Sequence, residues 1–213
     1  MISVEKFIVN PFMLNTLLLY DESNECVIID PGFSNQNERA KFLQFLSNTS
    51  LKPVGLINTH CHVDHILGNR FISEQFGLKI MANEHENSNL GIADATADIY
   101  GLPKPQSPSI EVFLNDGDNV SFGNSVLQVL FTPGHTAGGI SLYSEKDKIV
   151  VAGDLLFQGS IGRTDFPGGN YNTLIESVLN KIFVLPDDTK VYPGHGNETT
   201  VGEEKRFNPF FNE

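Results

Sequence analysis

Short runs of apolar residues, interrupted by turn residues, dominate the first part of the chain and predict strands. Three such runs cover residues 6–9, 15–20 and 26–30, and Pro31-Gly32 ends the third. Residues 38–46 instead carry apolar side chains at helical spacing, which predicts an amphipathic helix. A further apolar run at 54–58 leads into a second helix, which we expect over 66–76.

Residues 83–108 break this pattern. A polar stretch of helical character leads into Gly-Leu-Pro-Lys-Pro-Gln-Ser-Pro at 101–108, where the prolines remove hydrogen-bond donors and fix the backbone. We interpret 83–108 as an inserted segment on the surface, with a position beside the active site as a hypothesis.

The strand pattern resumes at 110–114, 126–131, 140–143 and 149–152, followed by a helix predicted at 174–182 and a strand at 190–192. Two batches of strands separated by helices favour an α/β fold with two sheets sandwiched between helical layers. The length of 213 residues fits one domain, and we expect that domain to span residues 1–213.

Composition and charge narrow the range of functions. Hydrophobic residues make up 40% of the chain and charged residues 19%, as in globular proteins. The net charge of −12 argues against nucleic acid as a partner, because phosphate binding needs a basic face. No stretch has the pattern of a secretory signal or the length of a membrane span. We therefore expect a cytoplasmic protein in which the two cysteines are free.

The densest group of metal-binding residue types is Thr-His-Cys-His-Val-Asp-His, which contains His60, His62, Asp64 and His65. In an extended segment His60 and His62 point to the same side, because side chains alternate along a strand. Cys61 then points the other way, and we interpret it as a small buried thiol that does not bind metal. Asp64 taken alone is equally explained as the N-cap of the following helix, but its histidine neighbours favour a ligand.

Three other residues extend this set, each in a glycine-containing turn just after a predicted strand. They are His135 in Pro-Gly-His-Thr, Asp154 in Ala-Gly-Asp, and His195 in Pro-Gly-His-Gly. Loops at the same end of successive strands can bring their side chains to one point. Taken singly, His135 could be an ordinary loop residue and Asp154 an ordinary turn residue. Five imidazoles and two carboxylates are enough for two divalent ions, with zinc favoured and iron or manganese as alternatives.

Two further residues have two interpretations each. Asp30, in Ile-Ile-Asp-Pro-Gly, is either a turn residue or a carboxylate that orients one of the metal-binding imidazoles, and we favour the second. His85 lies among Asn and Glu residues, and we interpret it as an ordinary surface histidine.

Taken in this order, the four histidine and aspartate motifs resemble the metallo-β-lactamase superfamily over nearly the whole chain. The resemblance implies an αββα sandwich of two mixed sheets flanked by helices, with a dinuclear metal site at one edge. It implies a first ion bound by His60, His62 and His135, and a second bound by Asp64, His65 and His195. Asp154 would bridge the two ions, with Asp64 and Asp154 as the catalytic carboxylates and a metal-bound hydroxide as the nucleophile.

Within this superfamily, residues 159–169 and 193–210 resemble the glyoxalase II group, the second segment its compact bacterial branch. That resemblance implies hydrolysis of a thioester such as hydroxyacylglutathione. Longer members contact glutathione through a C-terminal helical extension, whereas this sequence stops at Glu213, so the thiol of the substrate stays open. Arg163 is the candidate for binding a substrate anion, and an ion pair with Asp165 is the equal alternative.

Other functions remain to be separated from this one. Persulfide dioxygenases share the His-Cys-His-x-Asp-His segment and would hold one iron through His60, His135 and Asp154. The Pro-Gly-His-Gly turn at His195 favours the hydrolase, whereas Cys61 slightly favours the dioxygenase. A non-catalytic metal-binding protein is a third alternative, which the full ligand set disfavours. The missing export signal disfavours a secreted β-lactamase, and the acidic charge disfavours a nuclease.

Overall fold

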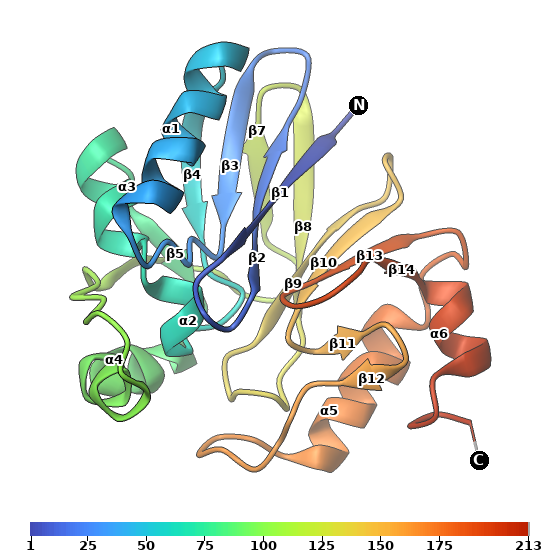
Figure 1. The fold of residues 1–213 in the computed structure, drawn as a ribbon. Coiled ribbons are helices and arrows are strands. Elements are labelled where there is room, and N and C mark those ends of the chain that lie inside the picture. Colours follow the sequence, from blue (N-terminus) through green and yellow to red (C-terminus); the bar gives the residue numbers. More distant parts are fainter. Residues whose placement is uncertain (213) are drawn as a thin grey trace. The chain divides into compact units, whose positions relative to one another are not determined.

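The computed structural model describes residues 1–212, and the chain divides into two compact units (Figure 1). Unit 1 comprises Met1–Phe113 and Ser121–Val126, and unit 2 comprises Leu114–Val120 and the residues from Leu127 onward. Each unit contains a sheet with its own helices. The expectation of one domain over residues 1–213 stays a prediction.

Unit 1 is built on a mixed sheet whose six strands follow one another in sequence order. They are β1 (Ser3–Val9), β2 (Leu14–Tyr20), β3 (Glu25–Ile29), β4 (Lys52–Ile57), β5 (Ile80–Ala82) and β6 (Ile110–Phe113). The first three strands pair antiparallel, and β3 to β6 pair parallel. Strands β2 and β3 are buried along almost their whole length, which explains why their sequences are nearly continuous apolar runs.

The helices of unit 1 are α1 (Gln36–Thr49), α2 (Val63–Ile66), α3 (Asn69–Phe76) and α4 (Asn87–Tyr100), with a 3₁₀ turn η1 (Glu84–Glu86). Figure 1 shows α1 and α3 on the same side of β3 and β4. Phe42 of α1 packs against Phe7 and Phe33, with ring centroids 5.3 and 4.9 Å apart. The side chain of Asn35 caps α1 by accepting a hydrogen bond from the backbone N–H of Glu38.

The single helix predicted over 66–76 is wrong, because the structure contains two helices separated at Leu67-Gly68. At this break the backbone of Gly68 lies against Pro31, and its N–H donates to the Pro31 carbonyl at 2.6 Å. A Cβ atom at Gly68 would lie only 2.7 Å from that carbonyl oxygen. The close approach therefore requires glycine, and it connects the start of α3 to the turn after β3.

The inserted segment consists of α4 and an irregular stretch that follows it, as the sequence predicts. The backbone N–H of Gln106 donates to Asp94 of α4 at 3.0 Å, and Asn69 of α3 donates to Ser107 at 3.0 Å. A cavity of about 420 Å³ lies between this stretch and α3, and none of the predicted metal ligands lines it. The irregular stretch thus contacts α3 and α4, and its Leu102 also packs in an apolar cluster with Val63 of α2, the residue between His62 and Asp64.

Unit 2 contains most of the second mixed sheet, in the order β14-β13-β10-β9-β8-β7. Its strands are β7 (Asn119–Phe122), β8 (Ser125–Phe131), β9 (Ile140–Ser144), β10 (Ile149–Gly153), β13 (Lys190–Pro193) and β14 (Thr199–Thr200). Strand β9 pairs antiparallel with both β8 and β10, whereas β10 and β13 are parallel. Strands β8, β10 and β13 therefore run in the same direction and end at the same edge.

The remaining elements of unit 2 are a hairpin and two helical segments. The hairpin joins β11 (Leu156–Phe157) to β12 (Ser160–Ile161). Helix α5 (Tyr171–Ser177) continues into a π-helical turn, η2 (Val178–Ile182), and α6 (Val201–Phe207) lies near the end of the chain. Leu174 and Val178 pack with Val150 of β10 and Val201 of α6 in one apolar core. In the described residues, no helix is long and apolar enough to cross a membrane.

Candidate functional site

Four of the predicted ligands, His60, His62, Asp64 and His65, follow β4 directly in unit 1, and we call them the N-terminal cluster. The ring centroid of His60 lies 4.8 Å from that of His62 and 4.0 Å from that of His65. The side chain of Cys61 is only 1% exposed and belongs to the apolar core. The prediction that alternation separates Cys61 from the two flanking imidazoles agrees with this geometry.

Helix α2 begins at Val63, so Asp64 lies in its first turn and His62 is the N-cap residue. The alternative of Asp64 as N-cap is therefore wrong. One carboxylate oxygen of Asp64 lies 3.7 Å from Nε2 of His65. The side chain of Asn10 donates to the Asp64 carbonyl at 3.0 Å and holds this turn of the backbone in place.

Asp30 is a buried carboxylate that controls the ring orientation of two imidazoles. Its Oδ2 accepts hydrogen bonds from Nδ1 of His65 at 3.0 Å and from Oγ1 of Thr59 at 2.6 Å. Its Oδ1 accepts from the backbone N–H of Thr59 at 2.7 Å. Because the Thr59 hydroxyl donates to Asp30, it accepts from Nδ1 of His60, which lies 3.2 Å away. We therefore assign the proton of both imidazoles to Nδ1, which leaves each Nε2 available to a metal ion.

Glu86 holds the same segment from the other side. Its buried carboxylate accepts the backbone N–H of Cys61 at 2.7 Å and the side-chain amide of Asn89 at 2.9 Å. Burial of the Cys61 thiol, with the negative charges of Glu86 and Asp30, raises the pKa of that thiol well above its usual value. Cys61 is therefore a neutral thiol at physiological pH, which makes it a poor metal ligand.

Sequence reasoning did not identify Thr59 or Glu86. Thr59 adjoins the histidines and follows a buried strand, so its position was a usable signal. Glu86 lies in a polar stretch among other acidic residues, where nothing in the sequence distinguishes it. Only the fold brings its carboxylate to the backbone of Cys61.

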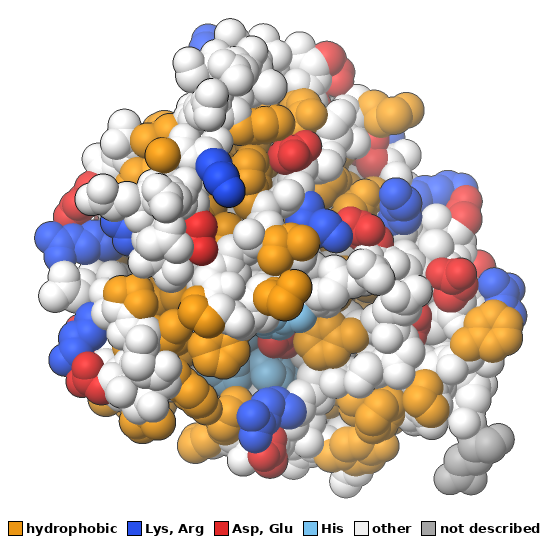
Figure 2. Space-filling view, viewed as in Figure 1, with side chains coloured by type: hydrophobic (Ala, Val, Ile, Leu, Met, Phe, Trp, Pro, Cys, Tyr) orange, Lys and Arg blue, Asp and Glu red, His pale blue; other side chains and the backbone are white. Residues whose placement is uncertain are grey.

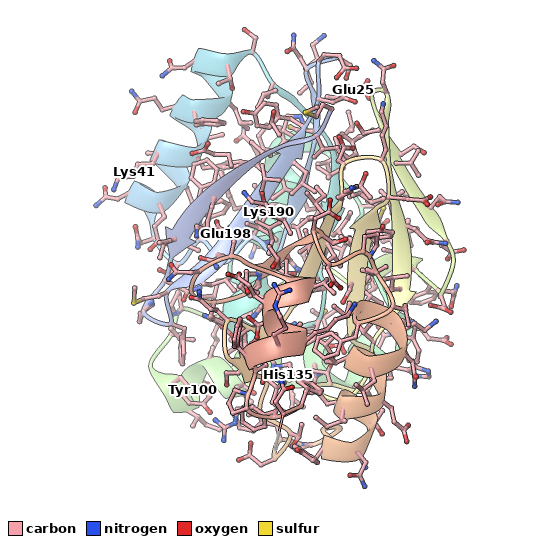
Figure 3. All side chains as sticks on the ribbon, turned by 90° about the vertical axis from the view of Figure 1, so that its right-hand side faces the viewer. Glu25, Lys41, Tyr100, His135, Lys190 and Glu198 are labelled. Atoms are coloured by element: carbon pink, nitrogen blue, oxygen red, sulfur yellow. The ribbon has the colours of Figure 1, made fainter. Side chains whose placement is uncertain are left out.

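The other predicted ligands, His135, Asp154 and His195, form the C-terminal cluster in unit 2. His135 follows β8, Asp154 follows β10 and His195 follows β13, so each leaves the sheet at the edge where these three strands end. Figure 3 shows the position of His135 on the ribbon. The sequence-based placement of each residue just after a strand agrees with the structure.

A single oxygen of Asp154 lies close to both imidazoles of this cluster. Asp154 Oδ2 is 3.7 Å from Nε2 of His135 and 3.6 Å from Nε2 of His195. Two ligand atoms bound tetrahedrally to one zinc ion lie about 3.4 Å apart, given metal–ligand distances of about 2.1 Å. The spacing of Asp154 to each imidazole therefore allows its carboxylate to share a divalent ion with either His135 or His195.

Backbone groups set the orientation of the C-terminal cluster. Nδ1 of His135 donates to the carbonyl of Arg163 at 2.7 Å, so its Nε2 is the atom that faces Asp154. Gly162 packs so closely that a Cβ atom would lie 1.8 Å from the Asp154 carbonyl oxygen. The N–H of Gly194 donates to the carbonyl of Gly153 at 2.9 Å and connects the loops that carry His195 and Asp154.

Several of these side chains are open to solvent. His62, Asp64, Asp154 and His195 are partly exposed, and Figure 2 shows histidine side chains at the molecular surface. Lys and Arg side chains on the same face are scattered among acidic ones (Figure 2). A small molecule can therefore reach residues of both clusters.

Arg163, the predicted anion-binding residue, forms two hydrogen bonds with the carboxylate of Asp165, each 2.7 Å long. Its guanidinium also stacks on the ring of Phe166, 3.8 Å from the centroid. The hydrogen bonds from Arg163 lower the pKa of Asp165 to about 2. The structure thus contains the ion pair that was the alternative for Arg163, and its role in binding substrate stays a prediction.

Comparison with known proteins agrees with this chemistry. The sequence profile described as the metallo-beta-lactamase superfamily matches residues 9–195. The hydroxyacylglutathione hydrolase GloC of Haemophilus influenzae is 36% identical over 99% of this chain and 98% of its own. Among solved structures, BLEG-1, described as a B3 metallo-beta-lactamase, superposes with a TM-score of 0.90 at 31% identity, covering 99% of this chain and all of its own. TTHA1623, described in a di-iron-bound form, superposes with a TM-score of 0.87 at 35% identity, covering 97% and 100%.

Proposed function

This chain belongs to the metallo-β-lactamase superfamily of metal-dependent hydrolases and has its fold of two mixed sheets flanked by helices, and we propose that its substrate is a thioester such as hydroxyacylglutathione. The observation that carries the proposal is the similarity to GloC, which extends over nearly the full length of both chains. The segment 159–169, which includes Arg163, supports the same substrate class through its resemblance to the glyoxalase II group.

We further propose that the N-terminal and C-terminal clusters bind two divalent ions per chain. The supporting observations are five imidazoles and two carboxylates, and the Nδ1 hydrogen bonds of His60, His65 and His135 that leave Nε2 for a metal. Zinc suits this mixture of ligands, and iron and manganese are alternatives. The di-iron form of TTHA1623 is a reason to test iron directly.

When bound, two such ions lower the pKa of a water molecule toward neutrality and polarise the carbonyl of the substrate. The protein's own residues prepare this chemistry. Asp30 holds the proton of His65 at Nδ1 and, through Thr59, that of His60, so that these rings do not rotate. The carboxylate of Asp154 offsets part of the positive charge beside His135 and His195. Arg163 would exchange Asp165 for an anionic group of the substrate.

One observation favours a second candidate, the hydrolysis of a β-lactam. BLEG-1 is described as a B3 metallo-beta-lactamase and superposes over nearly the whole of both chains. Both candidates use the same metal chemistry on an activated carbonyl, so they differ in the substrate that each accepts.

Four assays on the same metal-loaded protein test the proposal. We expect hydrolysis of hydroxyacylglutathione, followed by loss of thioester absorbance, to be the fastest, and a chromogenic cephalosporin to be a poor substrate. Oxygen uptake with glutathione persulfide tests the dioxygenase, and elemental analysis should give two ions per chain. Oxygen consumption without thioester cleavage, or a limit of one tightly bound ion per chain, would overturn the hydrolase.

The remaining predictions concern partners and location. We propose a small-molecule substrate and no nucleic-acid partner, which the absence of binding to DNA and RNA at low salt would support. The cytoplasmic location is part of this proposal, and both cysteines are free thiols as a reducing compartment requires. Fractionation of cells that express the protein tests this location.

A further inference from the structure

The side chain of Glu204, in helix α6, is a buried carboxylate whose hydrogen-bond donors are all neutral. Its Oε2 accepts the backbone N–H of Gly159 at 2.9 Å and the side-chain amide of Asn208 at 2.8 Å. Its Oε1 accepts the hydroxyl of Thr199 at 2.6 Å. Only 3% of Glu204 is exposed. Burying a charge in this way costs free energy, which the three hydrogen bonds offset.

Asn208 extends this contact to the next residue of the hairpin. Its side-chain amide donates to the carbonyl of Ser160 at 3.0 Å as well as to Glu204, and it is fully buried. Two side chains at the end of the chain therefore bind the backbone of Gly159 and Ser160. These two residues lie in and beside the turn that joins β11 to β12.

The hairpin contacts His195 directly and is joined to the other two residues of the C-terminal cluster by short segments of chain. It begins two residues after Asp154, and the ring of Phe157 on β11 meets the ring of His195 edge-on, with centroids 6.3 Å apart. Two residues after β12, the carbonyl of Arg163 accepts the hydrogen bond from His135. A shift of the hairpin would therefore change the contacts of both imidazoles together.

We propose that Glu204 and Asn208 are positioning residues, which hold the β11–β12 hairpin at Gly159 and Ser160 and thereby fix the rings of His135 and His195. This inference rests on the proposed metal binding by the C-terminal cluster. It assigns the end of the chain a part in the affinity of that cluster, although neither residue is a metal ligand.

The first test measures zinc affinity by competition with a chelator for three variants. Glu204→Ala removes the acceptor of the Gly159 N–H, and we expect the affinity of the more weakly bound ion to fall about tenfold, as for other groups that orient metal ligands. Glu204→Gln keeps one oxygen that accepts the Gly159 N–H. Its amide N–H group then faces Thr199, whose hydroxyl can accept a hydrogen bond in place of donating one. We therefore expect zinc affinity to stay within about threefold of wild type.

Val201→Ala is the matched control, because Val201 is fully buried in the same helix and its truncation lowers stability by loss of packing, without removing a hydrogen bond to the hairpin. We expect this control to bind zinc like the wild type despite its lower melting temperature. If Glu204→Ala and Val201→Ala lose stability alike and both keep wild-type affinity, Glu204 is merely structural and the proposal is wrong. Should Glu204→Ala fail to fold, Asn208→Ser, which removes the donor to Ser160, replaces it in the same comparison.

A second measurement does not depend on metal binding. Imidazole NMR signals of the metal-free protein should change at His135 and His195 in Glu204→Ala, while the signal of His85, an exposed histidine outside both clusters, stays in place. Unchanged signals at His135 and His195 would overturn the positioning role. If the wild-type chain bound no metal at all, the proposed function would fail, and these ring signals would still decide the role of Glu204.

Discussion

The two ligand clusters differ in how the chain holds them. The N-terminal cluster lies within one short segment between β4 and α2, and buried carboxylates from elsewhere in unit 1 fix it: Asp30 acts on the imidazoles and Glu86 on the backbone. The C-terminal cluster comes from three separate loops of unit 2. Its own residues are held by backbone contacts, among them the Arg163 carbonyl and the close packing of Gly162, and the carboxylate of Glu204 acts one step further away, on the β11–β12 hairpin.

This difference has a consequence for mutation. A cluster that depends on side-chain hydrogen bonds can be weakened gradually, because a conservative substitution removes one bond and leaves the backbone in place. A cluster that depends on backbone packing tolerates less, because added atoms move whole loops.

The largest effect is expected for Asp154→Asn. The change keeps the shape of the side chain but removes the negative charge beside His135 and His195, so two adjacent cations would repel each other with less compensation. We expect turnover to fall on the order of a thousandfold and one ion to be lost, while the protein stays folded. Metal content, turnover and thermal unfolding are the measurements. Two bound ions and near-normal turnover in this variant would refute the bridging role of Asp154.

Gly162→Ala tests the dependence of the C-terminal cluster on backbone packing. The new methyl group would meet the Asp154 carbonyl oxygen at 1.8 Å, so the backbone segments that carry Gly162 and Asp154 must move apart. We expect a loss of about 2–3 kcal/mol in the free energy of unfolding together with weaker metal binding. Gly159→Ala is the control, because a Cβ atom there has open space and only its positive φ of 66° carries a cost. Equal effects of the two variants would contradict the role of close packing at Gly162.

Asp30→Asn tests the side-chain network of the N-terminal cluster. Asn tolerates the positive φ of 50° at this position, so the backbone should be unchanged. Its amide group, however, would face a donor, either His65 or Thr59, and one of these hydrogen bonds would be lost. We expect turnover to fall about ten- to a hundredfold, which is less than for Asp154→Asn. A loss as large as that of Asp154→Asn would show that Asp30 itself binds metal.

The smallest effect is expected for Cys61→Ser. The thiol is buried in the apolar core and points away from the imidazoles that flank it. A hydroxyl there should lower stability by roughly 1–2 kcal/mol, with metal content and turnover kept near the wild type. The measurements are metal content and the melting temperature. Loss of metal from this variant would mean that Cys61 is a ligand.

The sequence alone predicted every strand that is long or strongly apolar, because such segments reveal their period without tertiary help. It missed β5, β7, β14 and the β11–β12 hairpin, which are short, and it missed α6. In these short strands the pairing partners decide the structure, since two to four residues carry too little pattern of their own. It also joined α2 to α3, because the close approach of Gly68 to Pro31 is a contact between distant parts of the chain.

In the candidate site, too, some features could be predicted from the sequence and others could not. Candidate ligands could be proposed from the sequence because histidine and aspartate seldom gather in a dense motif, or recur after strands in glycine-containing turns, unless they bind metal. The groups that orient those residues could not be predicted from the sequence. Glu86 reaches Cys61, Arg163 offers its carbonyl to His135, and Glu204 reaches Gly159, only because the fold brings together residues that are far apart in the sequence. A hydrogen bond to a backbone atom leaves no pattern in the sequence, so the sequence proposed the candidate ligands, and the tertiary structure decided which groups orient them.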